Sequence, residues 1–306
     1  MSSIDNLSRS VKDRLLNIAK NRDEDFNHIL IRYGLERTLY RLSQSTYKDK
    51  FVLKGATLFV YWCGGSHRPT LDIDLHCRDE LTVAEIERVI KEISKTEVED
   101  DGLIIYPETV QGEEIREGEV YQGVRVKLTG DLDDASVPIQ LDIGFGDSLQ
   151  PGVEIIEYPT LLDFPGPELN AYKPVTSIAE KSQFMVEAGV FNSRMKDYYD
   201  VWFLCTEFQF EGSNLRSTIE STFTRRKTKV PEVPPPALQS DFFENSQKLD
   251  QWSGFMERNN LSTEDLSLRE VVNELREFLL PVFDSINSSV RFEKKWLPGE
   301  GWVKDC

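Results

Sequence analysis

The chain has 306 residues, of which 39% are hydrophobic and 29% are charged, and its formal net charge is -17. This composition is typical of a globular protein, excludes a disordered chain, and argues against a broad basic surface that binds nucleic acid. The N-terminal residues are charged throughout and no run is apolar enough to span a bilayer, so we expect a soluble, cytoplasmic protein without a membrane partner. The four cysteines lack CxxC spacing, which argues against a zinc site and a disulfide framework.

The first part of the chain alternates between helical and extended patterns. Apolar residues recur every three or four positions from Ser10 to Ser43, which predicts helices, and we assign residues 1–50 to an N-terminal helical cap. The following patterns predict, in order, a helix over 54–63, a turn over 64–70, a strand over 71–77 and a helix over 81–95.

The middle and C-terminal parts are organised differently. The acid-rich residues 96–120 are expected to form solvated loops around a short strand, and residues 120–147 to form two strands joined by the turn 130–136. A proline-rich connector over 159–174 precedes two helices, the first of which we expect to begin at Thr176 or Ser177 because a hydroxyl there resembles an N-cap. Prolines interrupt the chain at 229–239, and amphipathic helix continues to about Phe283. We therefore predict an α+β fold, with a core domain over 51–165 and a mainly helical domain over 166–306.

Two aspartates interrupt the apolar run "LDIDL". Residues i and i+2 of a strand share a face, so the carboxylates of Asp72 and Asp74 should stand side by side. Asp142 lies on a later strand and would join them if both strands belong to one sheet. Three carboxylates at one place are suitable ligands for Mg²⁺ or Mn²⁺ beside a nucleoside triphosphate (NTP). The preceding turn contains Gly65 and Ser66, whose backbone N–H groups and hydroxyl suit phosphate oxygens.

Four sequence motifs are similar to those of a known protein family. In this order, "FVLKGATLFVYW…RPTLDIDL", "IQLDIGFGD", "SIAEK" and "SRMKDYYDVW" resemble the AbiEii/AbiGii-type nucleotidyltransferase toxins of type IV toxin-antitoxin systems, which include the MenT enzymes. The similarity runs from about Leu35 to Leu204. It implies a DNA polymerase beta-like nucleotidyltransferase fold, with a mixed-sheet core and helical N- and C-terminal segments. It also implies Asp72, Asp74 and Asp142 as catalytic metal ligands.

The resemblance also bears on residues around the nucleotide. Five residues separate Ser66 from Asp72, more than in the shortest form of the superfamily turn, so Arg68 and Thr70 are further candidates for phosphate contact. Lys54, in the helix expected before the turn, is another candidate for contact with the nucleotide. The equal alternative is that Lys54 is an exposed lysine beside a glycine that serves packing. The family pattern assigns Lys181 to the triphosphate oxygens, at a helix position that we expect to be exposed.

The acids of "SRMKDYYD" leave two interpretations open. Asp197 and Asp200 lie three residues apart on one helical face, one turn after Arg194. One interpretation is a helix-surface ion network in which Arg194 pairs with Asp197 and Lys196 with Asp200. The other is functional: Asp197 acts as a catalytic base or orients Lys181, while Arg194 and Asp200 support nucleotide binding.

The resemblance implies that a nucleoside monophosphate is transferred from NTP to the 3′ end of tRNA, and that a cognate antitoxin restrains the enzyme. Two alternatives stay open: a kinase of the same fold, and a catalytically silent acidic module that binds a basic protein. A tRNA acceptor would need a local basic contact, and the densest basic run contains Arg225, Arg226, Lys227 and Lys229. A solvated helix end is the alternative for that run.

Overall fold

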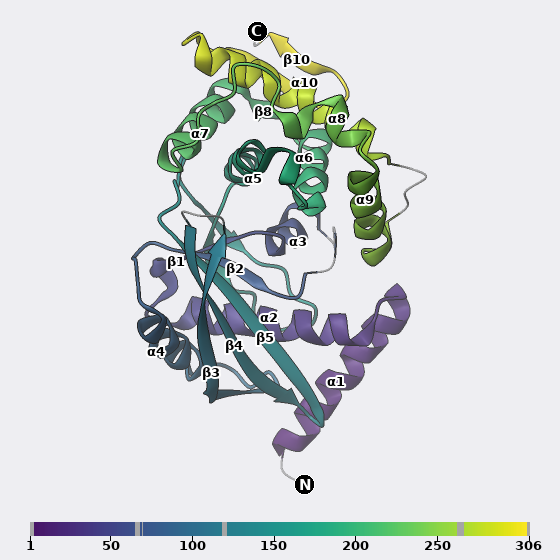
Figure 1. Cartoon of the computed structure of the whole chain (residues 1–306). Coiled ribbons are helices and arrows are strands. Elements are labelled where there is room, and N and C mark those ends of the chain that lie inside the picture. The colour runs from purple at the N-terminus through teal and green to yellow at the C-terminus, as the bar shows by residue number, and fades with distance from the viewer. Residues whose placement is uncertain (1–2, 65–67, 69, 118–120, 262–265, 305–306) are drawn as a thin grey trace. The chain divides into compact units, whose positions relative to one another are not determined.

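The computed structural model describes residues 3–64, 68, 70–117, 121–261 and 266–304, and divides into two compact units (Figure 1). Unit 1 comprises Met1–Gly146 and Val153–Tyr172, and unit 2 comprises Asp147–Gly152 and Lys173–Cys306. Each unit has its own core, so each is described by itself. Within the described ranges, every helix is too short or too polar to cross a membrane.

Unit 1 combines helices with a mixed sheet. Its elements are α1 (Ser3–Arg22), α2 (Phe26–Gln44), the 3₁₀ turn η1 (Lys48–Lys50), β1 (Phe51–Lys54), α3 (Thr57–Cys63), β2 (Ile73–Cys77), α4 (Val83–Ser94), β3 (Leu103–Glu117), β4 (Tyr121–Leu132), β5 (Ala135–Phe145), β6 (Glu154–Glu157) and β7 (Glu168–Ala171). The strands form one seven-stranded sheet in the order β3-β4-β5-β2-β1-β7-β6. The predicted mixed-sheet core with helical segments is therefore confirmed.

Strand β5 shows how the sheet separates a core face from a polar face. Its alternate residues Val137, Ile139, Leu141 and Ile143 are buried. Helix α2 packs on this side so closely that a Cβ on Gly34 would lie 2.5 Å from Val137. The intervening polar positions of β5 therefore point to the opposite face of the sheet.

The expectation of solvated loops around a short strand over 96–120 is wrong for residues 103–117. Residues Leu103–Glu117 form the long edge strand β3, which pairs antiparallel with β4. The inner face of β3 lies under α4, where Gly112 donates its N–H to Glu87 at 2.7 Å. The many acids misled the prediction because an edge strand places charged side chains on its solvated face.

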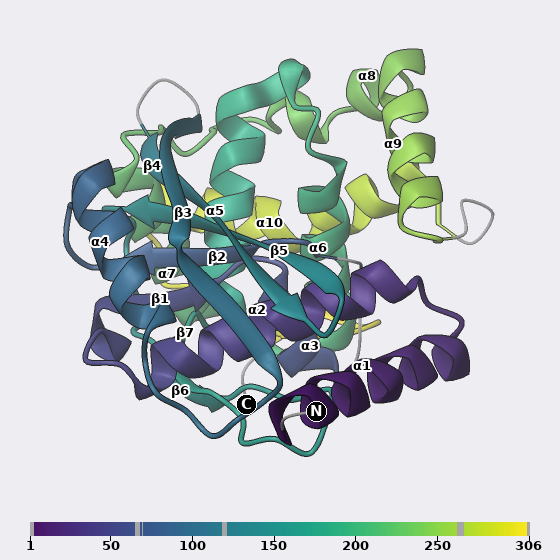
Figure 2. The ribbon, with the colours of Figure 1, turned by 90° about the horizontal axis from the view of Figure 1, so that it is seen from below.

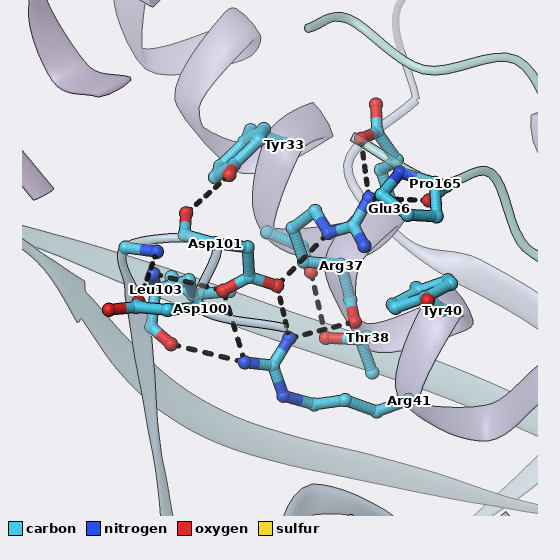
Figure 3. Close-up of polar contacts among 12 residues, drawn as sticks. Tyr33, Glu36, Arg37, Thr38, Tyr40, Arg41, Asp100, Asp101, Leu103 and Pro165 are labelled. Carbon is cyan, nitrogen blue, oxygen red and sulfur yellow. Dashed lines mark hydrogen bonds and ion pairs between the residues drawn. The ribbon is translucent and has the colours of Figure 1, made fainter. Parts of the chain in front are cut away.

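A buried ion-pair network ties α2 to the segment before β3 (Figure 3). The carboxylate of Asp101 accepts hydrogen bonds from Arg37 Nε at 3.0 Å and from Arg41 Nη1 at 2.8 Å, and all three side chains are buried. Tyr33 donates its hydroxyl to the Asp101 carbonyl at 2.5 Å. The N-terminal helical segment is thus part of the core of unit 1, and Figure 2 shows α1 lying alongside α2.

Glu36 extends this network to a later loop of unit 1. Its Oε2 accepts the N–H of Leu161 at 2.7 Å, and its Oε1 lies 3.4 Å from Arg37 Nη1. Burial raises the pKa of Glu36 to about 7, because the charged form loses its hydration, and the two donors only partly offset that loss.

Unit 2 is mainly helical. Its elements are α5 (Pro174–Ala188), the 3₁₀ turn η2 (Gly189–Phe191), α6 (Met195–Glu207), β8 (Phe210–Glu211), α7 (Gly212–Arg225), the 3₁₀ turn η3 (Pro236–Leu238), α8 (Ser240–Phe243), α9 (Ser246–Arg258), α10 (Leu268–Asn287), β9 (Lys294–Leu297) and β10 (Gly301–Lys304). The last two strands form a hairpin that joins β8 in a three-stranded sheet. Trp296 of β9 is buried and donates its indole N–H to the Cys205 carbonyl at 2.6 Å, so the C-terminal tail belongs to the core of this unit.

Helix α5 begins earlier than predicted. Lys173 is the N-cap and Pro174 occupies the first helical position, where the fixed φ of proline fits a helix and its missing N–H costs nothing. Thr176 and Ser177 lie inside the helix and are buried. The Thr176 hydroxyl donates to the Gln150 carbonyl at 3.1 Å instead of capping α5.

Candidate functional site: a charged row in unit 1 and a lysine–aspartate cluster in unit 2

Of the two aspartates of "LDIDL", one lies in a strand of the sheet and the other directly before that strand. Asp72 directly precedes β2 and Asp74 lies within it; both are half-buried, whereas Ile73 between them is fully buried. Thr70 donates its hydroxyl to Asp72 Oδ1 at 3.0 Å, and Thr57 donates to the Asp72 carbonyl at 3.2 Å. Thr70 therefore orients an acid of the site, in addition to its predicted candidacy for phosphate contact.

The strand order brings the third predicted acid beside the pair. Strands β2 and β5 run parallel, with Asp74 opposite Asp142. Neighbouring strands are about 4.8 Å apart, so two carboxylates on the same face are crowded unless cations or hydrogen bonds compensate them.

Both flanking strands supply a cation at this level of the sheet. Lys54 of β1 is opposite Asp74, and Arg125 of β4 is opposite Asp142. We call these four residues, in the order Lys54, Asp74, Asp142, Arg125, the charged row. Its formal charges are +, −, −, +, which explains how two like charges can occupy adjacent strands.

Arg125 binds Asp142 through two parallel hydrogen bonds. Arg125 Nε lies 2.8 Å from Oδ1 and Nη2 lies 2.6 Å from Oδ2. The bond to Asp142 raises the pKa of the guanidinium above its already high ordinary value, so Arg125 stays charged. The sequence interpretation missed Arg125, although its position between the buried Val124 and Val126 marks it as a polar-face residue.

Gly55 is required by the packing of Asp74. It adopts φ +76°, and a Cβ built on it would lie 1.9 Å from Asp74 Oδ2. The carboxylate therefore lies directly against the backbone of Gly55, where any side chain would displace it. Lys54 ends β1 and does not belong to a helix, which corrects its predicted placement. Its Nζ lies 3.6 Å from the position that a Cβ on Gly144 would occupy, on the same face as Asp142.

The donor chemistry of this site fits a divalent cation. Asp74 and Asp142 supply hard carboxylate oxygens on one face of adjacent strands, and Asp72 supplies another carboxylate directly before β2. Such oxygens are the ligand type that Mg²⁺ and Mn²⁺ prefer. Among the described residues, no group of three or more acidic, histidine or cysteine side chains is gathered in ligand geometry. Both carboxylate oxygens of Asp142 are directed toward the Arg125 guanidinium.

The predicted phosphate ligands before β2 belong to the segment that follows α3. Gly65 and Ser66 lie outside the described residues. Arg68 is described and half-buried in the loop between α3 and β2.

In unit 2, the structure brings together three predicted residues from α5 and α6. Lys181 Nζ lies 2.6 Å from Asp197 Oδ1 and 2.9 Å from Asp200 Oδ2. We call these residues the lysine–aspartate cluster. Asp200 is fully buried and Asp197 is 4% exposed, so a helix-surface ion network does not describe them. Only 14% of the Lys181 side chain is exposed, and the expectation of an exposed lysine is therefore wrong.

Arg194 lies directly before α6, where its guanidinium carbon stands 4.0 Å from the centre of the Phe184 ring. This distance is typical of a cation–π contact and holds the side chain over the ring.

The predicted basic run is only partly a surface feature. Arg226 Nη2 lies 2.7 Å from Asp147 Oδ1, and Arg226 Nη1 donates to Gln183 at 2.8 Å. The side chains of Arg226 and Asp147 are 12% and 2% exposed, so this arginine is an internal ion-pair partner and not an RNA contact. The other three basic residues, Arg225, Lys227 and Lys229, are exposed.

The comparison with protein families agrees with the sequence motifs. The family model for "Nucleotidyl transferase AbiEii toxin, Type IV TA system" matches residues 37–280, which include the charged row and the lysine–aspartate cluster. The chain is similar to two solved structures from Helicobacter pylori. JHP933 is 14% identical, with a TM-score of 0.48 over 85% of this chain and 94% of that one. A candidate nucleotidyltransferase is 15% identical, with a TM-score of 0.47 over 87% and 97%. No curated protein matches the chain.

Proposed function

The chain belongs to the AbiEii family of nucleotidyltransferase toxins of type IV toxin-antitoxin systems, and on this premise we propose that it transfers a nucleoside monophosphate from NTP to the 3′ end of tRNA. The observation that carries the proposal is Asp74 on β2 in register with Asp142 on the neighbouring strand, with Asp72 directly before β2. Membership of the family also implies an antitoxin partner, which would restrain the activity.

In this proposal Asp72, Asp74 and Asp142 hold Mg²⁺ or Mn²⁺. When bound, such an ion would neutralise negative charge on the triphosphate during transfer. Thr70 fixes the orientation of Asp72, and Gly55 leaves room for the carboxylate of Asp74. These two contacts position the acids before any ligand arrives, which lowers the cost of ordering them.

The lysine–aspartate cluster has a separate role in the proposal. Lys181 binds triphosphate oxygens as a compact positive charge. Asp197 and Asp200 orient its ammonium, because a carboxylate oxygen of each lies within 3 Å of Nζ. Burial of both acids favours this supporting role over proton transfer to solvent.

The proposal is tested by incubating the purified chain with tRNA and each NTP in turn, labelled at the α-phosphate, with Mg²⁺, with Mn²⁺ or with EDTA. We expect label on tRNA with at least one NTP, no label with EDTA, and no label for Asp74→Asn. Asp79→Asn is the matched control, since Asp79 follows the same strand but pairs with Lys50 at the surface.

The position of the label separates the alternatives. Transfer of label from the γ-phosphate and not from the α-phosphate would show a kinase. If neither label moves and calorimetry detects no NTP binding in Mg²⁺, the enzymatic proposal is wrong and a silent binding module becomes the better description.

A further inference from the structure

Strand β4 places two cations on the polar face of the sheet. Val124, Val126 and Leu128 are buried, so Arg125 and Lys127 between them share the opposite face. Lys127 pairs with Glu113 at 2.9 Å, and both side chains are more than half exposed. Arg125 instead pairs with Asp142, whose side chain is only 15% exposed. Of these two neighbours, therefore, Arg125 binds a proposed metal ligand and Lys127 does not.

The hydrogen-bonding capacity of Asp142 is largely filled. Its Oδ1 accepts from Arg125 Nε and also from Gln140 Nε2 at 3.3 Å, while its Oδ2 accepts from Arg125 Nη2. A carboxylate has about four lone-pair positions, so three are engaged here. One position remains, on Oδ2, so a metal ion that takes Asp142 as a ligand shares this carboxylate with the guanidinium and competes with it for the same negative charge.

We propose that Arg125 is a positioning residue that competes with the metal for Asp142 and makes metal binding depend on nucleotide. The inference rests on the proposed metal site. The guanidinium holds Asp142 in the metal-free protein, so a divalent ion alone binds weakly. A triphosphate changes the balance, because its oxygens offer the planar guanidinium a bidentate partner that replaces the carboxylate. Metal and nucleotide then bind cooperatively, each strengthening the binding of the other.

The test measures Mn²⁺ affinity by electron paramagnetic resonance, with and without a non-hydrolysable NTP analogue, so it needs no turnover. Without nucleotide, Arg125→Met should bind Mn²⁺ about tenfold more tightly than wild type, as expected for the loss of one charge-assisted competitor. The analogue should strengthen Mn²⁺ binding to wild type more than to Arg125→Met. Lys127→Met removes the same charge from the same strand face and should leave both affinities within about twofold.

Arg125→Lys guards against a folding defect. It keeps the positive charge but loses the two-pronged geometry, so its Mn²⁺ affinity should fall between those of wild type and Arg125→Met. An affinity equal to or below that of wild type in either folded variant overturns the inference, as does an equal gain in Lys127→Met.

Variants of the proposed metal ligands distinguish failure of this inference from failure of the proposed function. In Asp142→Asn, replacing Arg125 by Met should no longer tighten Mn²⁺ binding, because the contested carboxylate is gone. If Mn²⁺ binding is unaffected by Asp72→Asn, Asp74→Asn and Asp142→Asn, the metal site and the inference are both wrong. If these acids matter and Arg125→Met has no effect, only the inference is wrong.

Discussion

Replacement of Lys181 by Met tests the lysine–aspartate cluster of unit 2. The substitution removes the ammonium within 3 Å of both acids and leaves Asp197 and Asp200 almost fully buried without this cation. Removing one partner of a buried ion pair typically costs about 3–5 kcal/mol. Since the unfolding free energy of a domain is about 5–15 kcal/mol, the loss is a large part of the total.

The loss should depend on pH in a defined direction. Without Lys181, burial and mutual repulsion penalise the charged forms of the two carboxylates in the folded state. Protonation relieves this penalty, so the stability of Lys181→Met falls as pH rises. We therefore expect urea denaturation, followed by helical circular dichroism, to show a larger deficit at about pH 8 than at about pH 5.

Two further variants make the result specific. Lys196→Met changes an exposed lysine of the same helix α6 and should alter the unfolding free energy by less than about 0.5 kcal/mol. Asp200→Asn in the Lys181→Met background removes one of the two buried negative charges and should restore part of the loss. If Lys181→Met unfolds within about 1 kcal/mol of wild type at both pH values, the acids do not depend on this lysine and the reasoning is refuted.

Three other predictions concern separate parts of the chain. Gly55→Ala places a side chain at φ +76° and against the carboxylate of Asp74. It should therefore destabilise unit 1 by about 1–3 kcal/mol and weaken Mn²⁺ binding. An unchanged melting temperature and an unchanged Mn²⁺ affinity would contradict this prediction. Burial raises the pKa of Glu36 to about 7 from its ordinary 4.5, so the unfolding free energy of the wild type should fall as pH rises from 4.5 to about 7. In urea denaturation, Glu36→Gln should remove about 3 kcal/mol of this pH dependence. Neutralising Arg225, Lys227 and Lys229 together should lower the salt slope of RNA binding by up to about three units, and an unchanged slope would place the RNA contact elsewhere.

The acids of the candidate site were predictable because their signal is local. Alternation around Ile73 is enough to place Asp72 and Asp74 on one face, whichever sheet contains the strand. Asp142 required one further assumption, that its strand belongs to the same sheet, and the parallel register of β2 and β5 satisfies it.

Arg125 was missed because its role depends on hairpin register. Strands β4 and β5 are joined by the two-residue turn Asp133–Asp134, in which Asp133 has φ +56°. A turn of two residues fixes every cross-strand pair, and Arg125 and Asp142 are equidistant from this one. The predicted turn over 130–136 was too wide to define that register, so the partner of Asp142 could not be identified.

Sequence periodicity could not predict the burial of the lysine–aspartate cluster, for a different reason. The spacing of Asp197 and Asp200 places them on one face of α6, but a face with two acids resembles a solvated surface. The packing of α5 against α6 turns that face inward and brings Lys181 to both acids. Such a contact is a property of helix packing, and no residue pattern within α6 encodes its partner.

The charge balance of the charged row affects whether a metal ion binds alone or together with a nucleotide in the proposed function. Lys54 and Arg125 offset Asp74 and Asp142, so the four residues carry no net formal charge before a ligand arrives. A divalent cation alone would leave this row with two excess positive charges, and it would have to compete with Arg125 for Asp142. A triphosphate that arrives with the metal brings several negative charges and gives both flanking cations a new partner. In the proposed function the metal–nucleotide complex therefore supplies anionic partners for Lys54 and Arg125 that the free metal lacks, and this difference favours joint binding of metal and nucleotide over binding of the metal alone.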